Sequence, residues 1–212
     1  MNDAIKPTVM ATPEKHDPFL GRSVPLYCSA GLLLAFTVYF LFKGNYEFLT
    51  YTVSIGILIY LLLCTDRIFR YPLLALWGFA LWLFLHMAGG SFFFGGVRLY
   101  DFILIPLTDA PLHLLRYDQV VHSFCYFVIT LLTYALVNSI VAQEAKAFLV
   151  MLITFLAGIG IGAINEIIEF STVVFFGSTG VGDYYNNAMD LVFNGMGALV
   201  AVIMAYTSFY RR

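Results

Sequence analysis

Long apolar stretches dominate the pattern of hydrophobic and polar positions along this chain. Six of them are long enough to cross a bilayer, since a spanning helix needs about 20 mostly apolar residues: roughly 25–42, 47–64, 71–90, 119–142, 147–169 and 187–208. Two segments, Leu73–Leu85 and Phe148–Ile161, are apolar on all sides, whereas membrane-spanning strands alternate apolar and polar residues. The pattern therefore predicts an all-α, polytopic membrane helix bundle with about six transmembrane helices.

The polar segments between these stretches predict a tail and two long loops. Residues 1–24 carry charges of both signs and several prolines, so we expect a flexible cytoplasmic tail and no secretory signal peptide. Residues 25–212 are expected to form a single six-helix transmembrane domain. Its long outer loops are expected near residues 91–118 and 170–186.

The positions of lysine and arginine predict the orientation, because basic residues gather on the cytoplasmic side of membrane proteins. If both termini are cytoplasmic, eight basic residues lie on that side and three on the other. The eight are Lys6, Lys15, Arg22, Arg67, Arg70, Lys146, Arg211 and Arg212, and the three are Lys43, Arg98 and Arg116. We therefore expect both termini in the cytoplasm.

Composition narrows the surroundings and the partners of the chain. Its residues are 61% hydrophobic and 11% charged, whereas soluble domains have roughly 45–50% and about 25%. The lipid bilayer is therefore the expected partner. A net charge of −2 and the lack of any large basic cluster exclude nucleic acid as an expected partner.

Six ionisable side chains lie near the predicted outer ends of the helices. They are His86, Asp118, His122, Glu166, Glu169 and Asp190. Counting 1.5 Å per residue from the cytoplasmic charge of each helix places five of them about 24–35 Å from that side, and Asp118 lies one turn beyond His122. Because charge at membrane depth is costly, this single band predicts a functional site near the outer leaflet.

Helical spacing groups these residues on shared faces. Asp118 and His122 are four residues apart, and Glu166 and Glu169 are three apart, so each pair shares a helix face. The last helix carries a similar row, which consists of Asp183, Asn187, Asp190 and Asn194. Glycines on both sides allow close helix packing; these are Gly158, Gly160, Gly162, Gly195 and Gly197. Polar faces in lipid turn inward, and we therefore expect one shared pocket.

Two imidazoles and several carboxylates suit a divalent metal ion such as Zn²⁺, Mn²⁺ or Fe²⁺. The expected ligands are His86, His122, Glu166, Glu169 and Asp190. We expect catalytic roles for Glu166 and for Asp118, which orients His122. Asp183, Asn187 and Asn194 are expected to support the ligands. A purely structural interpretation makes Asp118 and Asp183 helix caps and the asparagines contacts between helices.

Four segments resemble, in order, motifs of the bacterial YjdF family of inner-membrane proteins. They contain Leu85-His86, Tyr117-Asp118-x-x-x-His122, Glu166-x-x-Glu169 and Asn187-x-x-Asp190. The resemblance covers about residues 70–205 and implies a multi-pass protein of the bacterial inner membrane. Asn186 or Asn187 stands where that family's pattern has an acidic residue. A looser likeness to VanZ-like proteins, through Asp190-x-x-x-Asn194-x-x-Gly197, implies a role in the cell envelope.

These features favour a metal-dependent membrane hydrolase or transferase that acts on a lipid or lipid-linked envelope substrate. A bound metal activates water or polarises a phosphoryl or carbonyl group, and one carboxylate serves as general base. Which carboxylate does so stays open. The alternative is an ion or metal permease, because intramembrane carboxylates and histidines also mark ion pathways. A non-catalytic scaffold held together by buried polar contacts is the third possibility.

Overall fold

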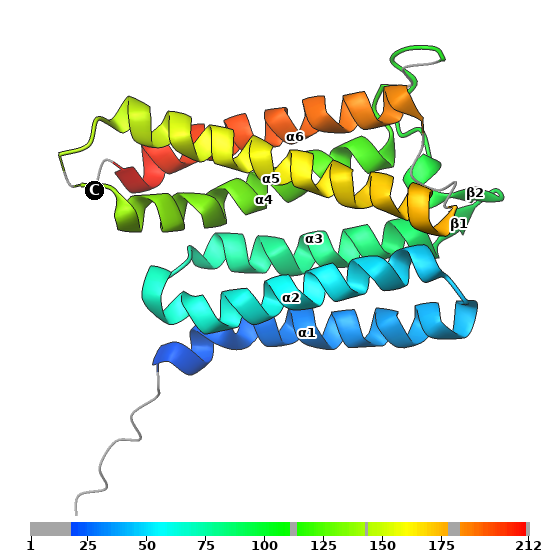
Figure 1. The fold of residues 1–212 in the computed structure, drawn as a ribbon, viewed down its shortest axis with the longest axis horizontal. Helices are drawn as coiled ribbons and strands as arrows, with labels where there is room; N and C mark the ends of the chain where they lie inside the picture. Colours follow the sequence, from blue (N-terminus) through cyan, green and yellow to red (C-terminus); the bar gives the residue numbers. More distant parts are fainter. Residues whose placement is uncertain (1–17, 111–113, 143, 178–182, 211–212) are drawn as a thin grey trace, which may run out of the picture.

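Six long helices form the molecule, for which a computed structural model describes residues 18–110, 114–142, 144–177 and 183–210 (Figure 1). The helices are α1 (Pro18–Lys43), α2 (Tyr46–Phe69), α3 (Leu73–Ser91), α4 (Tyr117–Ile140), α5 (Ala147–Phe176) and α6 (Tyr184–Ala205), followed by a short π-helical turn, Tyr206–Tyr210. Each of the six is long and apolar enough to cross a bilayer. The predicted six-span helical membrane bundle is therefore confirmed.

The first helix begins earlier than the predicted stretch, at Pro18, since proline is tolerated in the first turn of a helix. Residues 1–17 of the predicted tail lie outside the described residues. Arg22, in the added turns, lies 3.0 Å from Asp66 Oδ1 and donates to the Tyr71 carbonyl oxygen at 2.6 Å. These bonds attach the start of α1 to the connection between α2 and α3.

Helix α5 runs past the predicted end at residue 169 and stops at Phe176. The hydroxyls of Ser171 and Thr172 donate to carbonyl oxygens one turn earlier, at 2.7 and 2.8 Å. These polar side chains therefore do not interrupt the helix. Gly177 ends it with φ +64°, a left-handed conformation that glycine adopts without steric cost.

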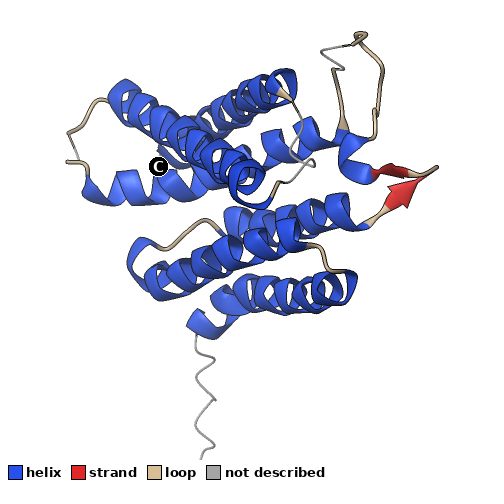
Figure 2. Cartoon of the chain, turned by 45° about the vertical axis from the view of Figure 1, so that its right-hand side comes forward, coloured by secondary structure: helices blue, strands red, loops and turns tan. Residues whose placement is uncertain are grey.

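The helices form two groups of three, α1–α3 and α4–α6, which lie side by side (Figures 1 and 2). Helices α3 and α4 join the groups, and α4 and α6 pack most extensively. A Cβ atom at Gly197 of α6 would lie 2.8 Å from the Ser123 carbonyl carbon of α4. Only a glycine allows the two backbones to come this close. The polar residues of α4 and α6 are thereby brought together.

The connection between α3 and α4 is a folded loop at one end of the bundle (Figure 1). It contains the antiparallel strands β1 (Phe93–Phe94) and β2 (Val97–Arg98) and the 3₁₀ turn Leu99–Asp101. Gly95 and Gly96 form the hairpin turn with φ +58° and +83°. We call this end of the bundle the hairpin end. The chain enters α1 and leaves α6 at the opposite end (Figure 1).

Candidate functional site

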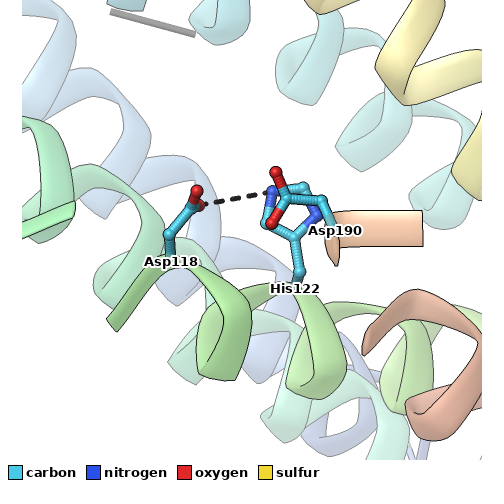
Figure 3. Close-up of side chains that lie close together, drawn as sticks. All are labelled: Asp118, His122 and Asp190. Atoms are coloured by element: carbon cyan, nitrogen blue, oxygen red, sulfur yellow. Dashed lines mark ion pairs between the residues drawn. The ribbon is translucent and has the colours of Figure 1, made fainter. Parts of the chain in front are cut away.

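Helix α4 places Asp118 and His122 at the hairpin end. Its start is fixed by Gln119, whose Oε1 accepts hydrogen bonds from the backbone N–H groups of Leu115 and Arg116 at 2.8 and 3.1 Å. Asp118 then lies in the first turn, where a negative charge is favoured by the helix dipole. His122 lies one turn further, with Nε2 3.4 Å from Asp118 Oδ1 (Figure 3).

Helix α5 brings two carboxylates to the same imidazole. Glu166 Oε1 lies 3.7 Å from His122 Nδ1, and Glu169 Oε1 lies 3.9 Å from His122 Nε2. Asn165 donates to Glu169 Oε1 at 2.7 Å. Both His122 and Glu166 are buried, at 8% and 5% exposure. The spacing of three residues therefore does place both glutamates on the face that meets α4.

Helix α6 contributes the most buried carboxylate, Asp190, which is 1% exposed. Its Oδ2 accepts a hydrogen bond of 2.7 Å from Asn186 Nδ2, which also lies 3.2 Å from Asp118 Oδ2. Among the described residues, Asp190 Oδ1 has no hydrogen-bond partner. A buried charged oxygen without a partner is costly, and Asp190 belongs to a group with Asp118 and His122 that could hold a cation.

Asn194 determines which nitrogen of His122 faces the carboxylates. Its Nδ2 donates to Glu166 Oε1 at 3.3 Å, so its Oδ1 is the atom 3.1 Å from His122 Nδ1. An amide oxygen accepts, and Nδ1 therefore carries a hydrogen. Nε2 then faces Asp118 and Glu169. In a neutral imidazole with its hydrogen on Nδ1, Nε2 carries only a lone pair and accepts. Carboxylate oxygens also accept, so a proton or a cation has to lie between Nε2 and these oxygens.

Two groups of potential metal ligands share His122. One consists of Asp118, His122 and Asp190 (Figure 3), and the other of His122, Glu166 and Glu169. Within each group the donor atoms lie within 4.8 Å of one another. Four carboxylates thus surround one imidazole. Carboxylates this close repel one another unless protons or a cation neutralise them. The donor set of oxygen and imidazole nitrogen fits Zn²⁺, Mn²⁺ or Fe²⁺.

His86 lies nearby but outside both groups. Its Nδ1 lies 2.5 Å from the Tyr100 hydroxyl. Burial raises the pKa of Tyr100 well above its usual value, so the hydroxyl keeps its proton and donates to Nδ1. The rings of Phe48, Tyr51 and Trp82 surround the imidazole at 5.4–5.6 Å between centroids. This nitrogen is therefore occupied, and the metal-ligand role of His86 stays a prediction.

A small cavity of about 30 Å³ at the hairpin end connects these residues with the loop between α3 and α4. Its lining includes Tyr51, His86, Tyr100, Asp118, His122, Glu169 and Asn186, and the charged residues Glu47, Arg98 and Asp101. A cavity of this size holds one or two water molecules, since one needs roughly 10–15 Å³. Its polar lining gives such water hydrogen-bond partners.

The supporting residues expected from the sequence take different places. Asn187 donates to Glu166 Oε2 at 2.8 Å, and Asn194 contacts both Glu166 and His122. Asp183 instead caps α6 by accepting from the backbone N–H of Asn186 at 3.0 Å. The capping interpretation therefore holds for Asp183, while the two asparagines contact the predicted ligands directly.

Arg116 is the main contact that the sequence did not reveal. It donates to Asn186 Oδ1 at 2.6 Å and to Asp101 Oδ1 at 2.9 Å. Its charge is thus paired with a loop carboxylate, and it reaches the cluster only through an asparagine. In the sequence, only its position directly before Tyr117-Asp118 indicated that Arg116 lies near the cluster.

Comparison with known proteins gives a family but no described activity. The family described as "Predicted membrane protein (DUF2238)" matches residues 24–211, which is consistent with the YjdF-like resemblance. No curated protein and no solved structure matches the chain. The chain belongs to the DUF2238 family of predicted membrane proteins.

Proposed function

We propose that this protein is a metal-dependent membrane enzyme whose metal ion is held by His122 Nε2 and the surrounding carboxylates. The observation that carries the proposal is the group formed by Asp118, His122 and Asp190, whose donor atoms lie within 4.8 Å of one another. Asp190, 1% exposed, leaves Oδ1 without a partner among the described residues, and His122 Nε2 faces two carboxylates. One divalent cation held by this group would give these atoms a partner and relieve the repulsion among the acids.

The proposed roles of three residues differ from the sequence-based expectation: Asp118 becomes a ligand, Glu166 serves only as the base, and His86 lies outside the ligand groups. Asn194, which accepts from His122 Nδ1, is the residue that orients the imidazole. Asp118 lies on the Nε2 side and is therefore proposed as a ligand together with Asp190 and Glu169. A bound divalent cation lowers the pKa of a coordinated water and polarises an acceptor oxygen.

Glu166 is the proposed general base. Asn187 and Asn194 hold its two oxygens at 2.8 and 3.3 Å, at the edge of the cluster rather than at its centre. A carboxylate fixed there takes the proton of the attacking water and returns it to the oxygen of the leaving group. The water oxygen would form the new bond to the carbonyl carbon or phosphorus, and the ester bond to the leaving oxygen would break as that oxygen takes the proton.

The proposed substrate is a lipid or lipid-linked envelope molecule of the bacterial inner membrane. The cluster lies at the hairpin end of helices that cross the bilayer, where head groups and water meet acyl chains. The distant likeness to VanZ-like proteins, with its implied envelope role, stays a prediction.

Metal analysis of purified protein tests the proposal. Wild type should carry about one equivalent of Zn, Mn or Fe per chain, and the Glu166→Ala, Glu169→Ala double variant should carry far less. Asp190→Asn keeps the size of the side chain and should also lose metal, which controls for misfolding. Equal metal content in all three proteins would overturn the proposal.

A reconstituted uptake assay separates the enzyme from a permease. The proposal expects no ion flux into proteoliposomes above that of protein-free vesicles. Uptake of an ion that Glu166→Gln abolishes would instead show a transport site and overturn the enzyme.

A further inference from the structure

A groove between α5 and α6 opens on the surface that faces the bilayer. Its volume is about 580 Å³, within the range of about 300–1,000 Å³ that is usual for small-molecule sites. Its apolar walls include Ile167, Phe170, Val173 and Leu191. These side chains are 37–63% exposed, and the groove lies within two transmembrane segments. All of its lining residues except Asp183 belong to helices that are long and apolar enough to lie among acyl chains.

Glu166 connects this groove with the metal cluster. The carboxylate lines the groove together with Asn187, and its Oε1 lies 3.7 Å from His122 Nδ1. The separate cavity at the hairpin end is lined by His122 and Glu169. The cluster thus has one side toward a polar cavity large enough for water and one side toward the groove. A reaction between water and a membrane lipid needs access of this kind from both sides.

The polar end of the groove determines which lipid it accepts. An acyl chain gains no hydrophobic free energy by moving from lipid into an apolar groove, because both surroundings are equally apolar. Selection must therefore come from the polar residues of the lining, which are Glu166, Asp183, Tyr184 and Asn187. None of the described lining residues is Lys or Arg. This acidic end favours hydroxyl donors and disfavours a phosphate.

We propose that the groove between α5 and α6 binds one acyl chain of a lipid with an uncharged, hydroxyl-bearing head group, of the acylglycerol class. The lipid enters sideways from the bilayer, its hydroxyl groups donate to Glu166, and its ester group reaches the cluster past that carboxylate. The inference rests on the proposed metal enzyme for the reaction, but lipid binding itself needs no metal.

Photo-crosslinking tests the groove. Protein in phosphatidylcholine nanodiscs is irradiated with a monoacylglycerol that carries a diazirine on its chain, and labelled peptides are mapped by mass spectrometry. The label should concentrate on the groove walls of α5 and α6. Leu191→Trp fills the groove and should reduce labelling about tenfold, equivalent to about 1.4 kcal/mol. Leu199→Trp is the matched control, since Leu199 is 50% exposed on α6 but lies outside the groove.

The outcomes separate this inference from the metal proposal. Equal labelling of the two tryptophan variants, or label spread evenly over all lipid-facing helices, would overturn it. Equal labelling by a diazirine phosphatidic acid of the same chain length would overturn the choice of head group. Metal content is measured in the same samples. If the groove is labelled but the protein carries no metal, the lipid site is supported and the metal site is refuted. If the protein carries metal but the groove is not labelled, the metal site is supported and the lipid site is refuted.

Discussion

Replacing Asn194 tests most directly how the cluster is organised. The side chain is fully buried and joins two predicted functional residues, since it lies 3.1 Å from His122 Nδ1 and 3.3 Å from Glu166 Oε1. Asn194→Leu fills a similar volume but makes neither bond. The imidazole then loses the partner that directs Nε2 toward Asp118 and Glu169.

Two independent estimates give the size of the effect. A buried donor left without an acceptor costs about 1–3 kcal/mol. Loss of a residue that orients a metal-bound histidine typically weakens metal affinity about 10–100-fold, which is about 1.4–2.8 kcal/mol. We therefore expect Asn194→Leu to raise the dissociation constant for the metal by one to two orders of magnitude, roughly.

Competition with a chelator of known affinity measures this constant, and a second variant distinguishes orientation from packing. Asn194→Asp still accepts from His122 Nδ1 and adds negative charge, so it should bind metal more tightly than Asn194→Leu. If packing alone mattered, the leucine would be tolerated and the buried aspartate would not. Equal affinities of wild type and Asn194→Leu, or weaker binding by Asn194→Asp than by Asn194→Leu, would refute the reasoning.

Three further predictions concern stability, measured by thermal unfolding in detergent with retention on size exclusion as the readout. Asp66→Asn removes the buried charged partner of Arg22 and should lower the free energy of unfolding by about 1–3 kcal/mol, less than for a fully buried pair because the arginine is partly exposed. An unchanged unfolding midpoint would contradict this. Thr130→Val should leave the free energy of unfolding unchanged or raise it by about 1 kcal/mol, because the buried Thr130 hydroxyl has no partner among the described residues. A clear loss of stability would show that this hydroxyl makes a stabilising hydrogen bond. Gly197→Val should lower the free energy of unfolding by at least about 1–3 kcal/mol and also weaken metal binding, because the Cβ atom of the valine would overlap the Ser123 backbone. A stable variant that still binds metal would mean that α4 and α6 can move apart without cost.

The helices were predictable because each is a continuous apolar stretch, but their ends were not. The apolar stretch predicted for α5 ended at residue 169, seven residues before the end of the helix at Phe176. In the structure Asn165 contacts Glu169 and Asn187 contacts Glu166. Polar residues paired across or along helices do not stop a helix. Only Gly177, with its left-handed backbone, does so.

The convergence of the site was predictable from depth and spacing, since both depend only on helical geometry. The structure brings Asp118, His122, Glu166, Glu169 and Asp190 together. The surroundings of His86 were not predictable, because the Tyr100 hydroxyl comes from a loop that folds back over the helix ends. The position of such a loop depends on tertiary contacts that no local pattern encodes.

The close packing of α4 and α6 has a consequence for the order in which the membrane domain assembles. His122 and Asn194 are separated by 72 residues of chain that include all of α5. At about 5–20 residues per second, synthesis of this segment takes roughly 4–14 s. Within that time α5 is completed before the asparagines of α6 that pair with Glu166 are made. The last of the six described helices, α6, therefore completes both the fold and the cluster.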